Sequence, residues 1–155
     1  MQNINGIPQV VEGVAYYSSV TIPKPDFNGE KNLYIVNLAV SDDVFKQFQN
    51  AGYNCGMKPA GRATFTEDPV ITFQQWELGS KGRPNRKPRL VDQEKNDVDV
   101  SLGNGSKVAV QWRHSEYGDD GKYRRPILEN VQIIDLVEYL GDNVEAGDSA
   151  ASLAF

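Results

Sequence analysis

The chain has 155 residues, 39% of them hydrophobic, which is enough for one buried core but too few for two comfortable domains. Its first residues lack the basic start and apolar run of a secretory signal, and no stretch approaches the roughly 20 apolar residues that span a bilayer. We therefore expect an intracellular, cytoplasmic protein with no membrane partner. A lone cysteine, Cys55, excludes an internal disulfide and is interpreted as a buried or inert thiol.

The charge is unevenly distributed. The net charge is −5, which argues at first against a nucleic-acid partner. Residues 81–89 nevertheless carry five cations and no acid, and residues 122–125 add three more cations. Because salt screens each charge beyond about 10 Å, two cationic segments can bind a polyanion locally on an acidic protein.

The chain contains segments rich in Val, Ile, Thr and aromatic residues, separated by Gly, Pro, Asn and Asp. They predict five main strands, at 11–22, 31–40, 70–78, 107–114 and 126–140. In 107–114, Val108, Val110 and Trp112 alternate with polar or small residues, which is typical of a strand with one core-facing side. Five strands favour a mainly all-β fold: a five-stranded Greek-key barrel of the oligonucleotide-binding (OB) type, with one short helix and a flexible C-terminal tail.

The helix is predicted from Ser41, Asp42 and Asp43, which cap its first turn, to about Gly52. The last strand changes its apolar phase between Ile133 and Ile134, which predicts the bulge or bend that barrel closure requires. The mixed charges of residues 89–100 leave their pairing open.

The domain is assigned to residues 1–141 and the tail to residues 142–155. The tail is poor in large apolar residues until Leu153 and Phe155, so we expect it to be flexible. It carries three acidic side chains and no Lys or Arg. A short acidic end can simply aid solubility. Alternatively, Glu145, Asp148 and the terminal Phe155 can be captured by a partner protein, or can compete with DNA for a basic groove.

Catalytic patterns are weak. The chain has one histidine, His114, and no nucleophile elbow, P-loop or HExxH motif, so we expect no cofactor, no metal and no enzyme activity. The best catalytic candidates are Glu116, Asp119 and Asp120, which could hold Mg²⁺ in a nuclease. The composition of this segment is better explained by a hairpin loop in which Asp-Gly forms the turn.

Single-stranded DNA binding accounts for more of the sequence, because unstacked bases need flat rings and phosphates need cations. Both occur together in and around residues 81–89 and 117–125. A charge run is usually only a solvated loop, and Phe73, Trp76 and Trp112 are more often core residues, Trp112 above all. Tyr117 and Tyr123 are the rings least easily explained by packing. The candidate nucleic-acid-binding residues are Lys24, Phe27, Tyr34, Phe73, Trp76, Lys81, Arg83, Arg86, Lys87, Arg89, Lys107, Trp112, Arg113, Tyr117, Lys122, Tyr123, Arg124 and Arg125.

Four stretches, IPKPDFNGE (22–30), GNGSKVAVQW (103–112), LENVQIIDLVEYL (128–140) and the final Phe155, carry a resemblance. With them the chain resembles the single-stranded DNA-binding proteins of short-tailed bacteriophages, an OB barrel with an interrupting helix and an acidic tail ending in Phe. The resemblance implies non-catalytic coating of single strands in replication and recombination, annealing, and recruitment of a polymerase, helicase or nuclease through the tail, in an infected bacterial cell. It places Lys24, Phe27, Lys107 and the 117–125 loop near the groove.

The chain departs from this pattern in its tail, which is less acidic than the family's, so competition with DNA and formation of a homodimer stay open. Two other functions compete with DNA coating. One is an OB-like protein–protein adaptor without nucleic-acid binding. The other is the metal-dependent nuclease built on Glu116, Asp119 and Asp120.

Overall fold

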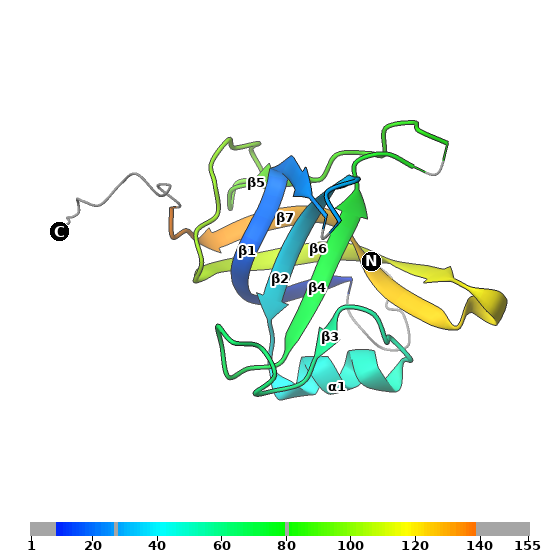
Figure 1. Ribbon diagram of the computed structural model, residues 1–155. Helices are drawn as coiled ribbons and strands as arrows, with labels where there is room; N and C mark the ends of the chain where they lie inside the picture. The colour runs from blue at the N-terminus through cyan, green and yellow to red at the C-terminus, as the bar shows by residue number, and fades with distance from the viewer. Residues whose placement is uncertain (1–8, 27, 80, 139–155) are drawn as a thin grey trace.

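The computed structural model describes residues 9–26, 28–79 and 81–138. Figure 1 shows strands that wrap around one core, with a single helix below them. The elements in chain order are β1 (Val10–Pro25), β2 (Asn32–Ala39), α1 (Asp42–Asn50), β3 (Met57–Lys58), β4 (Val70–Trp76), β5 (Arg89–Val91), β6 (Ser106–Tyr117), the 3₁₀ turn η1 (Asp119–Gly121) and β7 (Tyr123–Asp135).

One sheet with the strand order β3-β4-β2-β1-β6-β7-β5 closes on itself. Its antiparallel neighbours are β1 with β2, β2 with β4, β1 with β6, and β6 with β7. A parallel contact between β4 and β7, at Gln74 and Ile127, joins the two ends of the main sheet. β1, β2, β4, β7 and β6 therefore form the closed five-stranded barrel of the OB fold, as the sequence predicts.

Side chains at alternate positions along the strands fill the interior of the barrel. Val108, Val110 and Trp112 of β6 are completely buried, as are Val36 on β2 and Phe73 on β4. The residues between them along each strand point away from the core. The inner face is thus set by the period-two pattern, and the outer face is left for other contacts.

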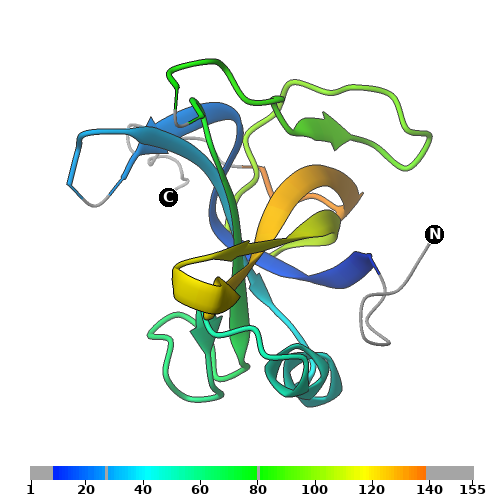
Figure 2. The ribbon, with the colours of Figure 1, turned by 90° about the vertical axis from the view of Figure 1, so that its right-hand side faces the viewer.

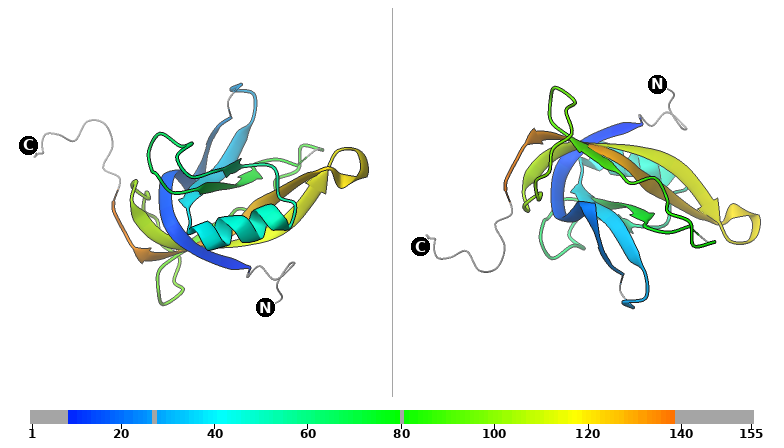
Figure 3. Two further views of the ribbon diagram at one scale, coloured as in Figure 1. Left: turned by 90° about the horizontal axis from the view of Figure 1, so that it is seen from below. Right: turned by 90° about the horizontal axis from the view of Figure 1, so that it is seen from above.

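Helix α1 closes the lower end of the barrel, as Figures 1 and 3 show. Ser41 caps the helix by accepting a hydrogen bond from the amide of Val44, as expected. Phe48 inserts from α1 between Trp112 and Phe73, with ring centroids 4.9 and 6.1 Å away. The helix therefore supplies the aromatic centre of the core.

The helix and the five main strands lie within a few residues of the positions predicted from the sequence. The predicted bulge is also confirmed: Val108 pairs with Ile133 and Lys107 with Asp135, which leaves Ile134 as the extra residue on β7. Within residues 89–100 only Arg89–Val91 forms a strand, parallel to β7. The predicted last strand is too long, because β7 ends at Asp135 rather than residue 140.

The tail residues Glu145, Asp148 and Phe155 lie outside the described residues, as do Phe27 and the boundary at residue 141. Within the described ranges, no helix is long and apolar enough to cross a membrane.

Truncation of Phe48 tests the role of α1 in the core. Phe48→Ala should lower the free energy of unfolding by about 3–5 kcal/mol, because it opens a cavity between Trp112 and Phe73. Urea denaturation measures the change, with Lys46→Ala on the exposed side of the same helix as the control. A loss below about 1 kcal/mol would contradict the packing described.

Candidate nucleic-acid interface

On the outer face of the barrel, a row of paired residues crosses the neighbouring strands β1, β2, β4, β7 and β6. Ser19 pairs with Ile35, Ile35 with Gln74, Gln74 with Ile127, and Ile127 with Arg113. Strands lie about 4.8 Å apart, so this row follows an arc of about 19 Å from β1 to β6. We call it the outer row. Its middle members are uncharged and only partly covered, so the row offers a continuous surface across the barrel.

Three loops surround this face. In Figures 1 and 2 the β6–β7 hairpin projects from one side of β4, while the β1–β2 connection and the segment after β4 lie at the upper end. The segments that carry the sequence's cations and rings are therefore on adjoining sides of one face. The sequence-based hypothesis required this arrangement.

The tip of the β6–β7 hairpin presents two stacked tyrosines. The rings of Tyr117 and Tyr123 lie 5.3 Å apart at an interplanar angle of 29°, and the two residues are 48% and 42% exposed. The ammonium group of Lys122 lies 5.0 Å from the centre of the Tyr123 ring. A flat aromatic surface and a cation are thus held side by side in solvent.

The base of this hairpin is fixed to the segment after α1. The hydroxyl of Tyr53 and Nδ1 of His114 share a hydrogen bond of 2.8 Å, and Nε2 of His114 bonds to Glu116 at 2.6 Å. Arg124 donates to the carbonyl of Ala51 at 2.7 Å and approaches Glu116 at 3.6 Å. The hydrogen bond from His114, followed by the charge of Arg124, outweighs the effect of desolvation and lowers the pKa of Glu116.

Cys55 reinforces this contact. Its half-buried thiol lies 3.3 Å from the hydroxyl of Tyr117. The hydrogen bond with the thiol, followed by burial, raises the pKa of Tyr117. The contacts of Cys55 thus add to those of His114 and Arg124, which position the hairpin. The Arg124 side chain is directed to the protein rather than to solvent.

Trp76 borders a hollow of about 570 Å³ at the other end of β4, lined also by residues 30–32, 77–79, 82 and 85. Trp76 is 36% exposed, and the ammonium group of Lys31 lies 5.6 Å from its ring centre. Asn85 donates to the carbonyl of Trp76, which folds the segment after β4 back over the hollow. The site again combines an indole face with a cation.

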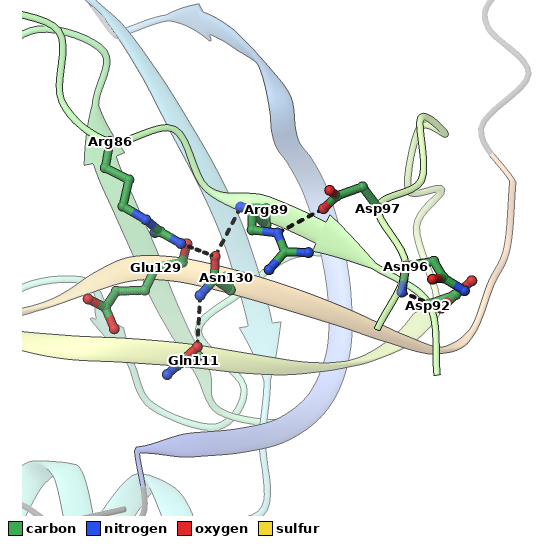
Figure 4. Close-up of polar contacts among 8 residues, drawn as sticks. All are labelled: Arg86, Arg89, Asp92, Asn96, Asp97, Gln111, Glu129 and Asn130. Atoms are coloured by element: carbon green, nitrogen blue, oxygen red, sulfur yellow. Dashed lines mark hydrogen bonds and ion pairs between the residues drawn. The ribbon is translucent and has the colours of Figure 1, made fainter. Parts of the chain in front are cut away.

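The basic segment 81–89 divides into two groups. Arg86 and Arg89 are fixed to β7: the Arg86 guanidinium and the Arg89 amide both donate to Oδ1 of Asn130, at 2.9 and 3.1 Å (Figure 4). The Arg89 side chain pairs with Asp97 at 2.8 Å, and Asn130 donates in turn to Gln111. Lys81, Arg83 and Lys87 are exposed and form no ion pair with any described residue.

For three of the predicted nucleic-acid-binding residues, the prediction that they offer a base-stacking surface is wrong. Phe73 and Trp112 are completely buried, and Tyr34 is 6% exposed. Their side chains point into the barrel because they occupy its inward positions, so no ring face is free for a base. They shape the interface only by supporting the strands.

The remaining predicted residues are spread more widely. Arg113 is at one end of the outer row and pairs with Glu129 at 3.7 Å, and Arg125 is on the same hairpin. Lys24 donates to the carbonyl of Tyr17 on β1. Lys107 lies at the opposite end of β6, paired with Val14 and Asp135, and does not join the outer row.

The carboxylates of the nuclease alternative do not gather. Glu116 pairs with His114 and Arg124, whereas Asp119 and Asp120 begin the exposed turn η1. Across residues 9–26, 28–79 and 81–138, no group of three or more His, Cys, Asp or Glu side chains could hold a metal ion.

A third aromatic group was missed at the sequence level. The rings of Tyr16 and Tyr17 both contact Phe65, at 4.9 and 5.3 Å. The pair YY inside a strand was a signal, because two successive large residues break the expected alternation. Nothing in the sequence indicates that Phe65 joins them.

The closed five-stranded barrel, with the outer row and the surrounding loops, defines the OB class of fold. Comparisons with known proteins agree with this assignment. No family model matches the chain, and no curated protein matches its sequence. Among solved structures, gp2.5, a single-stranded DNA-binding protein encoded by bacteriophage T7, matches with a TM-score of 0.60 and 17% identity over 88% of this chain and 96% of that one. The single-stranded DNA-binding protein from bacteriophage Enc34, solved in complex with single-stranded DNA, matches with a TM-score of 0.58 and 14% identity over 84% and 87%. At these identities the likeness shows a shared fold.

Removal of Asn130 should loosen the basic segment. Asn130→Ala deletes the acceptor for Arg86 and for the Arg89 amide, so the free energy of unfolding should fall by about 1–3 kcal/mol and exchange of the Arg89 amide should accelerate. Urea denaturation and hydrogen exchange measure both effects. Asn28→Ala, the same change at an exposed position, is the control. Unchanged exchange at Arg89 would contradict the anchor.

The ionisation of Tyr53 makes the free energy of unfolding depend on pH in the alkaline range. Burial raises its pKa from 10 to about 12, so the folded state retains this proton more tightly than the unfolded chain. The resulting stabilisation is fully present below pH 10 and is lost as the pH rises towards 12. In Tyr53→Phe the fall in the free energy of unfolding over this interval should be smaller than in the wild type. An equal fall in wild type and Tyr53→Phe would contradict the assignment.

Proposed function

We propose that this protein binds single-stranded DNA without sequence preference along the outer row. One observation carries the proposal: exposed rings with adjacent cations flank one continuous, largely uncharged barrel face. Tyr117, Tyr123 and Lys122 are on the hairpin at its β6–β7 end, and Trp76 and Lys31 lie beside its middle, where Trp76 is two residues from Gln74 on β4. The barrel is shared with two phage proteins described as single-stranded DNA-binding.

The chemistry favours an unpaired strand. A base can stack on Trp76 or Tyr123 only when its own face is free, and in a duplex that face is covered by the next base pair. Stacking does not read the edges of the bases, so it tolerates any sequence. The uncharged floor formed by Ile35, Gln74 and Ile127 lets bases lie across the strands without the desolvation of a buried charge.

Phosphates would be held by the cations that the fold leaves unpaired. Lys81 and Arg83 are exposed beside the Trp76 hollow, and Lys122 is exposed on the hairpin. The net charge of −5 does not oppose this binding strongly, because ionic screening confines each cation's influence to its surroundings. Binding should accordingly weaken as the salt concentration rises.

The biological role follows as part of the same proposal. We propose that the protein coats and protects single strands during phage replication and recombination in the cytoplasm of an infected bacterium. It would act without catalysis. The tail, with Glu145, Asp148 and Phe155, would recruit replication proteins. The resemblance found in the sequence supports these points.

Deletion of Phe155 tests the recruitment of replication proteins by the tail. The association with a partner protein should weaken, while DNA binding is spared or strengthened.

Loss of either ring should weaken the complex. Trp76→Ala and Tyr123→Ala should each lower the affinity for oligo-dT by about 5- to 150-fold, because a base–aromatic stack contributes about 1–3 kcal/mol. Trp76→Phe and Tyr123→Phe keep an aromatic face and should retain most of the affinity. Fluorescence anisotropy of labelled oligo-dT at fixed salt measures the change. Equal affinity of the wild type for single-stranded and double-stranded DNA would contradict the proposal.

Loss of one phosphate contact has a separate signature. Arg83→Ala should reduce the slope of log affinity against log salt by about 0.7, whereas Lys46→Ala on α1 should leave it unchanged. Wild-type protein that binds no oligonucleotide would favour the adaptor alternative. Cleavage of labelled DNA in the presence of Mg²⁺ or Mn²⁺ would favour the nuclease.

A further inference from the structure

β1 contains one extra residue at Tyr17. Tyr16 pairs with Asn37 and Ser19 with Ile35, so three steps along β1 correspond to two steps along β2. The buried positions of β1 accordingly change from odd to even numbers, from Ala15 to Val20. Tyr17 is the residue left over, and its backbone has a φ of 49°, a left-handed conformation that is costly for a tyrosine.

Side chains support this bulge where the strand ladder is interrupted. Asn37 donates to the carbonyls of Tyr16 and Tyr17 at 3.2 and 3.4 Å, and is itself held by Thr72 at 2.7 Å. Asn104 accepts from the amide of Tyr17 at 2.7 Å. The backbone groups freed by the bulge are thus satisfied by the side chains of Asn37 and Asn104, with Thr72 orienting Asn37, and the strained conformation is stabilised by its surroundings.

The bulge brings two successive aromatic side chains to one place. In a regular strand Tyr16 and Tyr17 would point to opposite faces, whereas here both rings contact Phe65, at 4.9 and 5.3 Å. The Tyr17–Phe65 contact is edge-to-face, and Tyr17 is still 55% exposed. Tyr17 is the most exposed aromatic residue in the described part of the chain.

This aromatic group continues the outer row. Tyr16, Asn37 and Thr72 are partners across β1, β2 and β4; they lie two residues from the outer row on β2 and β4, and three residues from it on the bulged strand β1. The ammonium group of Lys24 lies 3.5 Å from the carbonyl of Tyr17, so a cation is held at the backbone of the residue that carries the exposed ring. In Figure 3 the β1–β2 hairpin and the loop before β4 lie on the side of the face away from the β6–β7 hairpin.

We propose that Tyr17, supported by Tyr16 and Phe65, is a further stacking site for a nucleobase, with Lys24 contacting the adjacent phosphate. This inference rests on the proposed function and extends it: a single strand that crosses the outer row from the β6–β7 hairpin ends on β1. The site combines the two features of the other ring sites, an exposed π-face and a nearby cation. The bulge explains why a strained tyrosine is placed there.

Length dependence of binding separates this site from the others. Tyr17→Ala should lower the affinity for long oligo-dT by about 5- to 150-fold, the loss of one base stack, and should have little effect on oligomers too short to reach from the hairpin to β1. Tyr17→Phe should behave as the wild type, because stacking needs the ring and not the hydroxyl. The alanine variant keeps a Cβ and therefore the same backbone strain, and thermal unfolding verifies that it folds.

Photo-crosslinking gives a second readout. Oligo-dT in which bromodeoxyuridine replaces thymidine should form adducts on the peptide that contains Tyr17, and Lys24→Ala should reduce their yield. If Trp76→Ala and Tyr123→Ala weaken binding while Tyr17→Ala leaves both affinity and crosslinks unchanged, this site is refuted and the proposed function stands. If the wild type binds no oligonucleotide, the proposed function itself is refuted.

Discussion

The contact between β4 and β7 is the constraint on which the rest of the structure depends. Where Gln74 meets Ile127, the two ends of the main sheet join, and the sheet becomes a barrel. The same contact brings the β6–β7 hairpin beside the outer face of β2 and β4. Barrel closure therefore also creates the surface: without it, the two groups of rings and cations would lie on separate parts of an open sheet.

The aromatic and cationic residues serve two different purposes. Phe48, Phe73 and Trp112 form the core, and Arg86, Arg89 and Arg124 hold loops in place. What remains exposed is a smaller set of rings, each with a cation close by. This division explains how an acidic protein can present a local site for a polyanion, because the fold itself uses part of the basic segments and leaves the rest unpaired.

Sequence periodicity predicted the strands, the helix and the bulge at Ile134, because these follow from local alternation and capping. The polar composition of the 117–125 loop also identified Tyr117 and Tyr123 as rings outside the core, whereas Trp76 could not be told from the core residues Phe73 and Trp112. The sequence could not separate Arg83 from Arg86, since only the partner Asn130, 44 residues further on, distinguishes an anchored guanidinium from a free one. Phe65 was missed for the same reason: its partners Tyr16 and Tyr17 are distant in sequence, and their orientation depends on a bulge.

Amide chemical shifts during titration with oligo-dT at low salt provide the most direct measurement of the central claim. The expected result is a continuous set of perturbed amides from the β6–β7 hairpin through Ile127, Gln74 and Ile35 to β1. Perturbations confined to the hollow lined by Lys95, Arg89 and Gln111, or no perturbation at saturating oligonucleotide, would contradict the account.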